Sequence, residues 1–210
     1  MYDSLIQKLA DGNKDLDIPP LDPVEIKDFV IKTQEIGPFK INCTFDNSTF
    51  HGFRNTTTKK FTGFLKDFDG KENEIMLFTP KYVMNGIYDA RGTLFGLPLQ
   101  ISGNSTVILL NVHTRLRFIS RKLEKNGKIY ARIDNMKIKA EFDRMRLEFP
   151  ESREDNRIVE EIAYEYVNSN WKQVYSILKS SIYKTFTKIW QDIFNQITTK
   201  IPYEEFFIDE

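Results

Sequence analysis

A stretch of the chain without glycine or proline limits the possible folds more than any other feature. It runs from Glu151 to Ile201, with Asn156 as a suitable N-cap and Pro202 as a stop. The roughly 45 residues between these two would form a helix about 65 Å long. Aliphatic residues recur there at helical spacing, and aromatic residues widen the apolar stripe. We therefore expect one very long C-terminal helix that other parts of the chain cover on several sides.

Residues 24–149 have the composition of a β-sheet, because they are rich in β-branched and aromatic side chains and are interrupted by dispersed glycines. The clearest strand lies between Ser105 and Arg121, where apolar residues share one parity and polar residues the other. This pattern predicts a strand with one buried face and one wet face. The apolar set is Ile108, Leu110, Val112, Leu116 and Phe118.

Beyond Gly127 the apolar residues change parity twice. The set that contains Ile133 gives way to a set that contains Ile138, and a second change precedes Met145. Because side chains alternate strictly along a strand, each change predicts a bulge or a sharp bend that restores the same inward face. A long strand bent twice is typical of a strongly curled sheet.

These patterns predict an α+β fold, in which a long curled antiparallel β-sheet is rolled around one very long C-terminal α-helix. Leu5, Ile6 and Leu9, at helical spacing before Gly12, predict a short N-terminal helix. No linker divides the chain, so we expect residues 1–210 to form a single domain.

Composition and motifs argue against several kinds of function. Thirty basic residues balance thirty acidic ones, which disfavours nucleic-acid binding, and no apolar run approaches the roughly 20 residues of a membrane span. His51 and His113 have no partner at metal-ligand spacing. No catalytic or phosphate-binding motif occurs, and Glu160 and Glu161 are expected on a solvated surface. We therefore expect no metal, no cofactor and no enzymatic activity, and we expect Cys43, the only cysteine, to be a buried hydrophobe.

Glycosylation sequons are more frequent than the composition predicts. Four Asn-X-Ser/Thr motifs occur where chance would give about two, and three of them crowd into one short stretch. This frequency favours a secreted protein. The acceptor residues are Asn42, Asn47, Asn55 and Asn104.

Several short motifs occur in a fixed order over nearly the whole chain. They include Ile18-Pro19-Pro20-Leu21-Asp22-Pro23, Asn85-Gly86-Ile87-Tyr88, Leu97-Pro98-Leu99, Gly127-Lys128-Ile129-Tyr130 and Asn168-Ser169-Asn170-Trp171. In this ordered set the chain resembles the insect haemolymph juvenile-hormone-binding protein and takeout family of tubular lipid-binding proteins. The resemblance implies a sheet wrapped around a long helix, a hydrophobic tunnel, secretion into a haemolymph-like fluid, and cargo such as juvenile hormone, fatty-acid derivatives or isoprenoids. It also implies an N-terminal cysteine pair, which this chain lacks.

The primary hypothesis is a secreted, monomeric carrier that binds one small elongated hydrophobic ligand in an internal tunnel. Strand and helix parity nominate Ile108, Leu110, Val112, Leu116, Phe118, Ile133 and Ile138 from the sheet, and Val174, Leu178, Ile182 and Phe186 from the helix, as tunnel lining. The resemblance implies that Leu5, Ile6 and Leu9 form part of a gate near the tunnel mouth.

Two other hypotheses remain open. The same apolar residues would equally fill a dense core, and the protein would then recognise a receptor or a microbial lipid through its surface. A lipid-modifying esterase is a third hypothesis, for which the sequence offers no acid-base pair.

Overall fold

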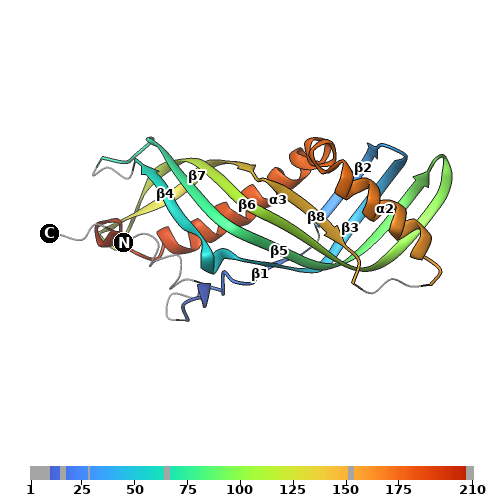
Figure 1. Ribbon diagram of the computed structural model, residues 1–210. Coiled ribbons are helices and arrows are strands. Elements are labelled where there is room, and N and C mark those ends of the chain that lie inside the picture. The colour runs from blue at the N-terminus through green and yellow to red at the C-terminus, as the bar shows by residue number, and fades with distance from the viewer. Residues whose placement is uncertain (1–9, 15–17, 28, 64–66, 151–153, 207–210) are drawn as a thin grey trace.

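The computed structural model describes residues 10–14, 18–27, 29–63, 67–150 and 154–206, and it shows a sheet and two helices arranged along one long axis (Figure 1). The strands are β1 (Val24–Ile26), β2 (Phe29–Ile36), β3 (Phe39–His51), β4 (Thr57–Thr62), β5 (Glu72–Leu94), β6 (Leu97–Lys125), β7 (Lys128–Glu141) and β8 (Arg144–Glu148). The helices are α2 (Arg157–Ser169) and α3 (Trp171–Thr198), with short 3-10 turns η1 (Phe53–Asn55) and η2 (Tyr203–Phe206).

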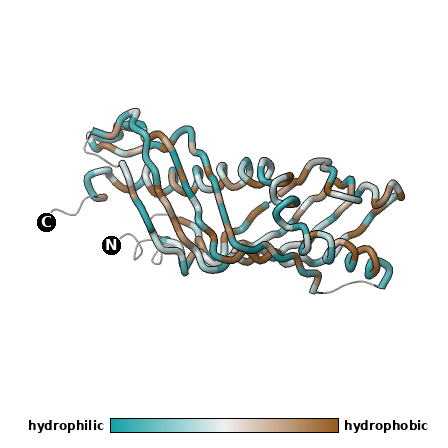
Figure 2. The backbone as a smooth tube through the Cα atoms, turned by 45° about the horizontal axis from the view of Figure 1, so that its top comes forward, coloured by the Kyte–Doolittle hydropathy of each residue, from teal (hydrophilic) through white to brown (hydrophobic). Residues whose placement is uncertain are grey.

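The sheet is built on one long hairpin. Strands β5 and β6, of 23 and 29 residues, pair over most of their length through the turn at Phe95-Gly96. Strand β3 continues the sheet beyond β5, and β7 continues it beyond β6, with every pairing antiparallel. Hydrophobic and hydrophilic residues alternate along these strands (Figure 2), as expected of a sheet with one apolar face. The predicted curled antiparallel sheet is confirmed.

Bulges keep the apolar face turned inward along the strands. At Asn135, which has a φ of 51°, the pairing of β6 with β7 shifts register, and buried Ile133 is followed by buried Met136. This confirms the predicted change of parity. A change of parity that was not predicted lies at Asn111, which has a φ of 53°. Strand β5 changes parity at the same level, between buried Thr79 and buried Tyr82, so the two strands keep their register. Upstream of Asn111 the inward residues are therefore the odd-numbered ones.

The C-terminal helical segment is divided in two, so the expectation of one very long helix was wrong. Helix α2 has 13 residues and α3 has 28, and they follow one another along the molecule with a change of direction between them (Figure 1). At the break, the backbone N–H and the side-chain amide of Asn170 both donate to the carbonyl of Tyr166, at 3.0 Å each. A short polar side chain that competes for backbone groups in this way is a recognised cause of helix termination. The expected N-terminal helix lies outside the described residues.

Side chains of both helices bind the outer edge of the sheet. Asn195 of α3 accepts from the N–H of Ile133 at 2.7 Å and donates to the carbonyl of the same residue at 3.0 Å. Asn168 of α2 makes the same pair of bonds with Leu147 in β8, at 2.8 and 2.9 Å. Each amide thus pairs with the strand as a neighbouring strand would. These bonds hold both helices against the sheet.

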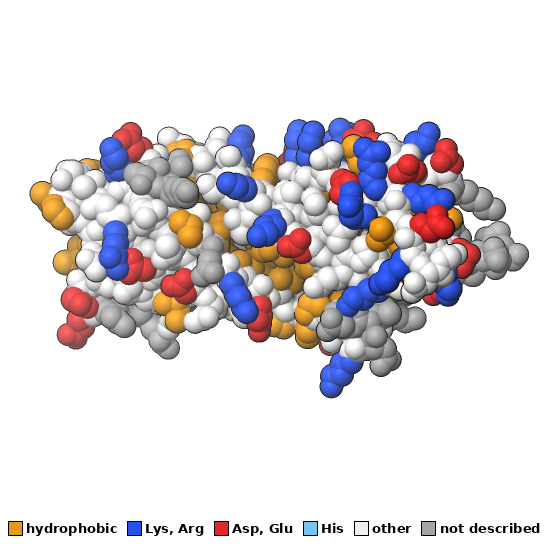
Figure 3. All heavy atoms as spheres, turned by 180° about the vertical axis from the view of Figure 1, so that it is seen from behind, with side chains coloured by type: hydrophobic (Ala, Val, Ile, Leu, Met, Phe, Trp, Pro, Cys, Tyr) orange, Lys and Arg blue, Asp and Glu red, His pale blue; other side chains and the backbone are white. Residues whose placement is uncertain are grey.

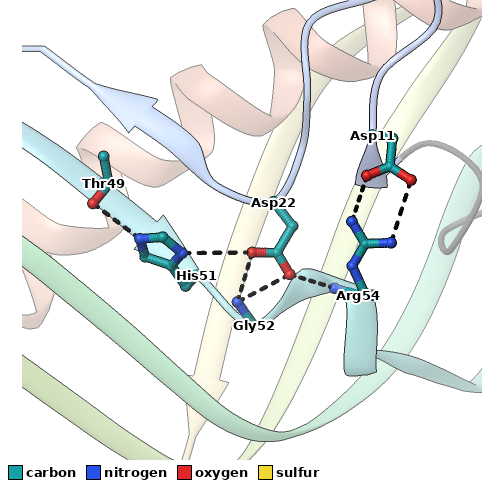
Figure 4. Close-up of polar contacts among 6 residues, drawn as sticks. All are labelled: Asp11, Asp22, Thr49, His51, Gly52 and Arg54. Atoms are coloured by element: carbon teal, nitrogen blue, oxygen red, sulfur yellow. Dashed lines mark hydrogen bonds and ion pairs between the residues drawn. The ribbon is translucent and has the colours of Figure 1, made fainter.

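The connector before β1 is attached to the corner between β3 and β4 by polar contacts (Figure 4). The carboxylate of Asp22 accepts hydrogen bonds from the backbone N–H groups of Gly52 and Arg54, at 3.1 and 2.8 Å. The Arg54 guanidinium in turn binds the Asp11 carboxylate through both oxygens. Asp11 and Asp22 therefore each contact the turn η1 from the part of the chain that precedes β1.

We expect Arg54→Ala to raise the pKa of Asp11 to its ordinary range. The hydrogen bond and the positive charge of Arg54 hold the pKa of this exposed carboxyl below that range. The pair therefore stabilises the folded state at neutral pH, and this contribution is lost as the pH falls through the lowered pKa. An NMR titration of the Asp11 carboxyl measures the shift, with Arg132→Ala as the control. An unchanged midpoint in Arg54→Ala would mean that the ion pair does not form in solution.

Candidate ligand-binding site

A cavity of about 250 Å³ lies between the inner face of the sheet and the two helices. Strands β2, β3, β5, β6, β7 and β8 contribute side chains to its wall, together with α2 and α3. The described lining residues are almost all aliphatic or aromatic, and none of them carries a formal charge. Viewed from the opposite side to Figure 1, apolar side chains lie in a recess at mid-length of the molecule, with Lys and Arg side chains around it (Figure 3).

The cavity occupies only part of the interior. Near the turn between β6 and β7, bulky side chains fill the space between sheet and helix, and Leu116, Phe118 and Ile133 are at most 1% exposed. Phe194 of α3 packs against this cluster, with its ring centroid 5.7 Å from that of Phe118. The interior is therefore packed at one end and hollow where α2 and the part of α3 up to Trp190 cover it.

One hydroxyl of the wall belongs to a buried threonine network. Tyr82 accepts a hydrogen bond from Thr79 at 2.9 Å, and Thr79 lies 2.7 Å from the hydroxyl of Thr56. Burial raises the pKa of Tyr82 to about 12. This tyrosine therefore stays protonated at neutral pH.

A second group of hydroxyls satisfies the backbone of β7. Tyr175 donates to the carbonyl of Ala140 at 2.8 Å, and Tyr183 accepts from the N–H of the same residue at 3.1 Å and lies 2.8 Å from the Tyr175 hydroxyl. Burial, followed by the hydrogen bond with Tyr183, raises the pKa of Tyr175 above its ordinary range. Both tyrosines present their rings to the cavity and direct their hydroxyls to the sheet edge.

Cys43 also lines the cavity and is 5% exposed, as expected of a buried hydrophobe. Burial, aided by the negative charge of Asp89, raises the pKa of this thiol to about 12. Since the thiolate is the reactive form of cysteine, Cys43 is unsuited to nucleophilic chemistry at neutral pH. The described residues hold no cluster of three or more His, Cys, Asp or Glu side chains able to bind a metal ion.

A buried carboxylate lies at the α2 end of the cavity. The ring of Tyr88 lines the cavity, and its hydroxyl donates to Oε1 of Glu160 at 2.5 Å. Glu160 is 2% exposed and lies one helical turn before Ala163, which also lines the cavity. The expectation of a solvated surface was therefore wrong for Glu160, which faces the sheet. It holds for Glu161, which is exposed and pairs with Arg157 at 3.1 Å.

Comparison with known proteins agrees with this architecture. The family model described as "Haemolymph juvenile hormone binding protein (JHBP)" matches residues 1–208. The chain belongs to this family. The "Circadian clock-controlled protein daywake" of Drosophila melanogaster is 21% identical over 211 residues, covering 99% of this chain and 81% of that protein. The daywake protein of Drosophila yakuba is 22% identical over 209 residues, covering 97% and 80%.

A solved structure shows the same fold. The crystal structure of Epiphyas postvittana Takeout 1 matches with a TM-score of 0.83 at 17% identity, and the match covers 97% of this chain and 91% of that one. The resemblance to the juvenile-hormone-binding and takeout family is thus confirmed. Neither described helix is both long enough and apolar enough to cross a membrane.

The structure brings together some of the residues nominated as lining and excludes others. The six that line the cavity are Val112, Ile138, Val174, Leu178, Ile182 and Phe186. Leu116, Phe118 and Ile133 lie instead in the packed end, because the sheet and α3 meet there without a gap. The nominated gate residues Leu5, Ile6 and Leu9 lie outside the described residues.

Ile108 and Leu110 lie on the outer face of β6, so their nomination as lining was wrong. The change of parity at Asn111 turns Val107 and Leu109 inward in their place. Ile108 and Leu110 instead border a groove on the outer face, together with Lys81, Arg144, Arg146, Tyr164 and Asn168.

Parity counting on β5 would have found several lining residues that were not nominated. Tyr82, Met84, Tyr88 and Ala90 share one parity along β5, and all four line the cavity. No comparable sequence pattern predicts that residues of α2 line the cavity. Ala163 lines the cavity only because the segment turns at Asn170 and lays α2 over the end of the sheet.

Proposed function

We propose that this protein is a secreted carrier that holds one small elongated hydrophobic ligand, of juvenile-hormone, fatty-acid or isoprenoid type, in the internal cavity. The observation that carries the proposal is a hollow with an uncharged, almost wholly apolar lining. Membership of the haemolymph juvenile hormone binding protein family supports it. We further propose that residues 1–210 act as a single domain and as a monomer.

The affinity of such a carrier comes from removing apolar surface from water. Each methylene of a ligand chain buried in the cavity contributes about 0.8 kcal/mol, so a chain of moderate length reaches micromolar or tighter binding without a covalent step. The side chains of Tyr82, Tyr175 and Tyr183 direct their hydroxyls into the wall. These features support binding without catalysis as the mode of action.

Surface features support secretion. The four sequon residues Asn42, Asn47, Asn55 and Asn104 all have exposed side chains, so the folded protein leaves them accessible to glycans. The competing hypothesis, a solidly packed protein that recognises a receptor or a microbial lipid through its surface, accounts less well for the hollow half of the roll.

Filling the cavity should remove ligand binding. Leu178 lines the cavity from α3, so Leu178→Trp places a larger side chain in the space that a ligand would occupy. We expect the affinity for N-phenyl-1-naphthylamine, measured by fluorescence titration, to fall by about tenfold or more, which corresponds to 1.4 kcal/mol or more. Lys179→Trp is the matched control, because Lys179 is the exposed neighbour on the same helix. Equal affinity in wild type and Leu178→Trp would argue that the probe binds elsewhere.

A further inference from the structure

The groove on the outer face of the sheet brings together three basic side chains. Lys81 of β5 and Arg144 and Arg146 of β8 line it, with Ile108 and Leu110 of β6 between them. Helix α2 borders the groove beside β8 (Figure 1). None of the described residues that line this groove is acidic. The groove is therefore positively charged, in contrast to the uncharged cavity on the inner face.

The register of the strands fixes how these side chains are arranged. Lys81 pairs with Leu110, and Leu110 pairs with Arg144, so the three residues form one row across the outer face. Neighbouring strands are about 4.8 Å apart, which places the backbones of Lys81 and Arg144 roughly 10 Å from each other. Arg146 lies two residues further along β8 and therefore on the same face. Three long basic side chains thus surround the position above Leu110.

The charge of these side chains is only partly neutralised. Nε of Arg146 lies 2.9 Å from Oε1 of Glu148. Lys81 and Arg144 form no ion pair with any described residue, and Arg144 donates only a long hydrogen bond, of 3.4 Å, to the carbonyl of Asn168. Three basic groups and one acid leave an excess of two positive charges. Because like charges at neighbouring positions repel one another, a bound anion would stabilise this arrangement.

The floor of the groove is apolar. Leu110 is 37% exposed, and half-buried Ile108 lies beside it and pairs with Arg146. Tyr164 of α2 stands at the border, where its hydroxyl lies 3.5 Å from a guanidinium nitrogen of Arg146. An inorganic anion would leave the aliphatic floor in contact with water, whereas the first carbons of an alkyl chain would cover it. The groove therefore suits an anion that carries an apolar chain.

We propose that this groove is a second binding site and that its ligand is an alkyl phosphate. The phosphate lies between Lys81, Arg144 and Arg146, and the alkyl chain lies on Leu110 and Ile108. A phosphate monoester carries about 1.5 to 2 negative charges at pH 7 and offers three acceptor oxygens, which matches the excess charge and the three basic groups. A carboxylate brings one charge and two oxygens. The site goes beyond the proposed carrier function, because it lies on the opposite face of the sheet from the cavity.

The test measures the affinity for hexyl phosphate by isothermal titration calorimetry, with inorganic phosphate and hexanoate as comparison ligands. On wild-type protein at pH 7 we expect hexyl phosphate to bind about tenfold more tightly than either, since only this probe uses both the basic groups and the floor. Lys81→Gln and Arg144→Gln should each weaken its binding by about tenfold, because each removes one charged contact. Arg121→Gln is the matched control on the outer face of β6, near the turn to β7, and should keep the wild-type affinity.

A second variant tests the apolar floor. Leu110→Ser should lower the affinity for hexyl phosphate towards that for inorganic phosphate and leave the binding of inorganic phosphate unchanged. Equal binding of hexyl phosphate and inorganic phosphate to wild type would contradict the proposed alkyl contact. Unchanged affinity for hexyl phosphate in both Lys81→Gln and Arg144→Gln would overturn the site itself.

A competition experiment separates this site from the cavity. Hexyl phosphate should not displace N-phenyl-1-naphthylamine, because the two sites lie on opposite faces of the sheet. Displacement would place hexyl phosphate in the cavity and overturn the inference while the carrier function stands. If the naphthylamine does not bind at all, the carrier function loses its support, and the titrations of Lys81→Gln and Arg144→Gln still decide the outer site.

Discussion

Replacing Leu116 with alanine should lower the free energy of unfolding by about 3 kcal/mol and leave the affinity for lipids unchanged. Leu116 has no exposed surface and belongs to the packed end of the roll, where Phe118 and Ile133 surround it. Truncation there removes buried methyl groups and leaves a hole that tightly packed neighbours fill only in part. Urea denaturation measures the loss of stability, and titration with 1-dodecanol measures affinity.

Leu178→Ala is the matched comparison, because the same substitution is made where the side chain already faces open space. We expect a loss of stability below about 2 kcal/mol, since few packing contacts are lost there. The affinity for 1-dodecanol should fall instead. Equal losses of stability at Leu116 and Leu178 would argue that the cavity is filled in solution, and a loss of affinity in Leu116→Ala would place this residue in the binding site.

Asn168→Ala should also destabilise the protein strongly, by about 3 kcal/mol. The buried Asn168 amide satisfies both the N–H and the carbonyl of Leu147, and its removal leaves two backbone groups unpaired at about 1 to 3 kcal/mol each. Asn168→Asp retains an acceptor for the N–H but sets a buried carboxylate oxygen against the carbonyl of Leu147, so it should also destabilise the protein strongly. Thermal and urea denaturation measure both effects.

Ser169→Ala serves as the control for this prediction, because Ser169 is the exposed neighbour on the same helix. A change of at most about 0.5 kcal/mol is expected there. If Asn168→Ala were as mild as Ser169→Ala, water would be replacing the amide at the edge of β8.

The sequence predicts the sheet and the change of parity at Asn135 but not the one at Asn111, and this difference has a physical cause. Around Asn135 polar residues separate the apolar ones, so the change of parity is visible. Before Asn111 the chain reads Val107-Ile108-Leu109-Leu110, and a run of apolar residues of both parities conceals which of them face inward. For this reason Ile108 and Leu110 were wrongly nominated as lining residues.

The helix break and the buried carboxylate were beyond prediction for a similar reason. Asn170 ends helix α2 through hydrogen bonds to one carbonyl. A single asparagine within a long apolar pattern is not enough to predict the end of a helix. Glu160 stands beside Glu161 among charged residues, which is typical of a wet face. Only the change of direction at Asn170, which lays α2 across the sheet, explains why one of two adjacent glutamates is buried.

The amide side chains that bind the sheet edge also bear on self-association. A free strand edge with unpaired N–H and carbonyl groups is a template on which another chain can add a strand. Asn195 and Asn168 occupy such groups on β7 and β8 with helical side chains, which cannot propagate a ladder. We therefore expect substitutions that loosen these helices to expose both strand edges and to promote aggregation, whether or not a ligand is bound.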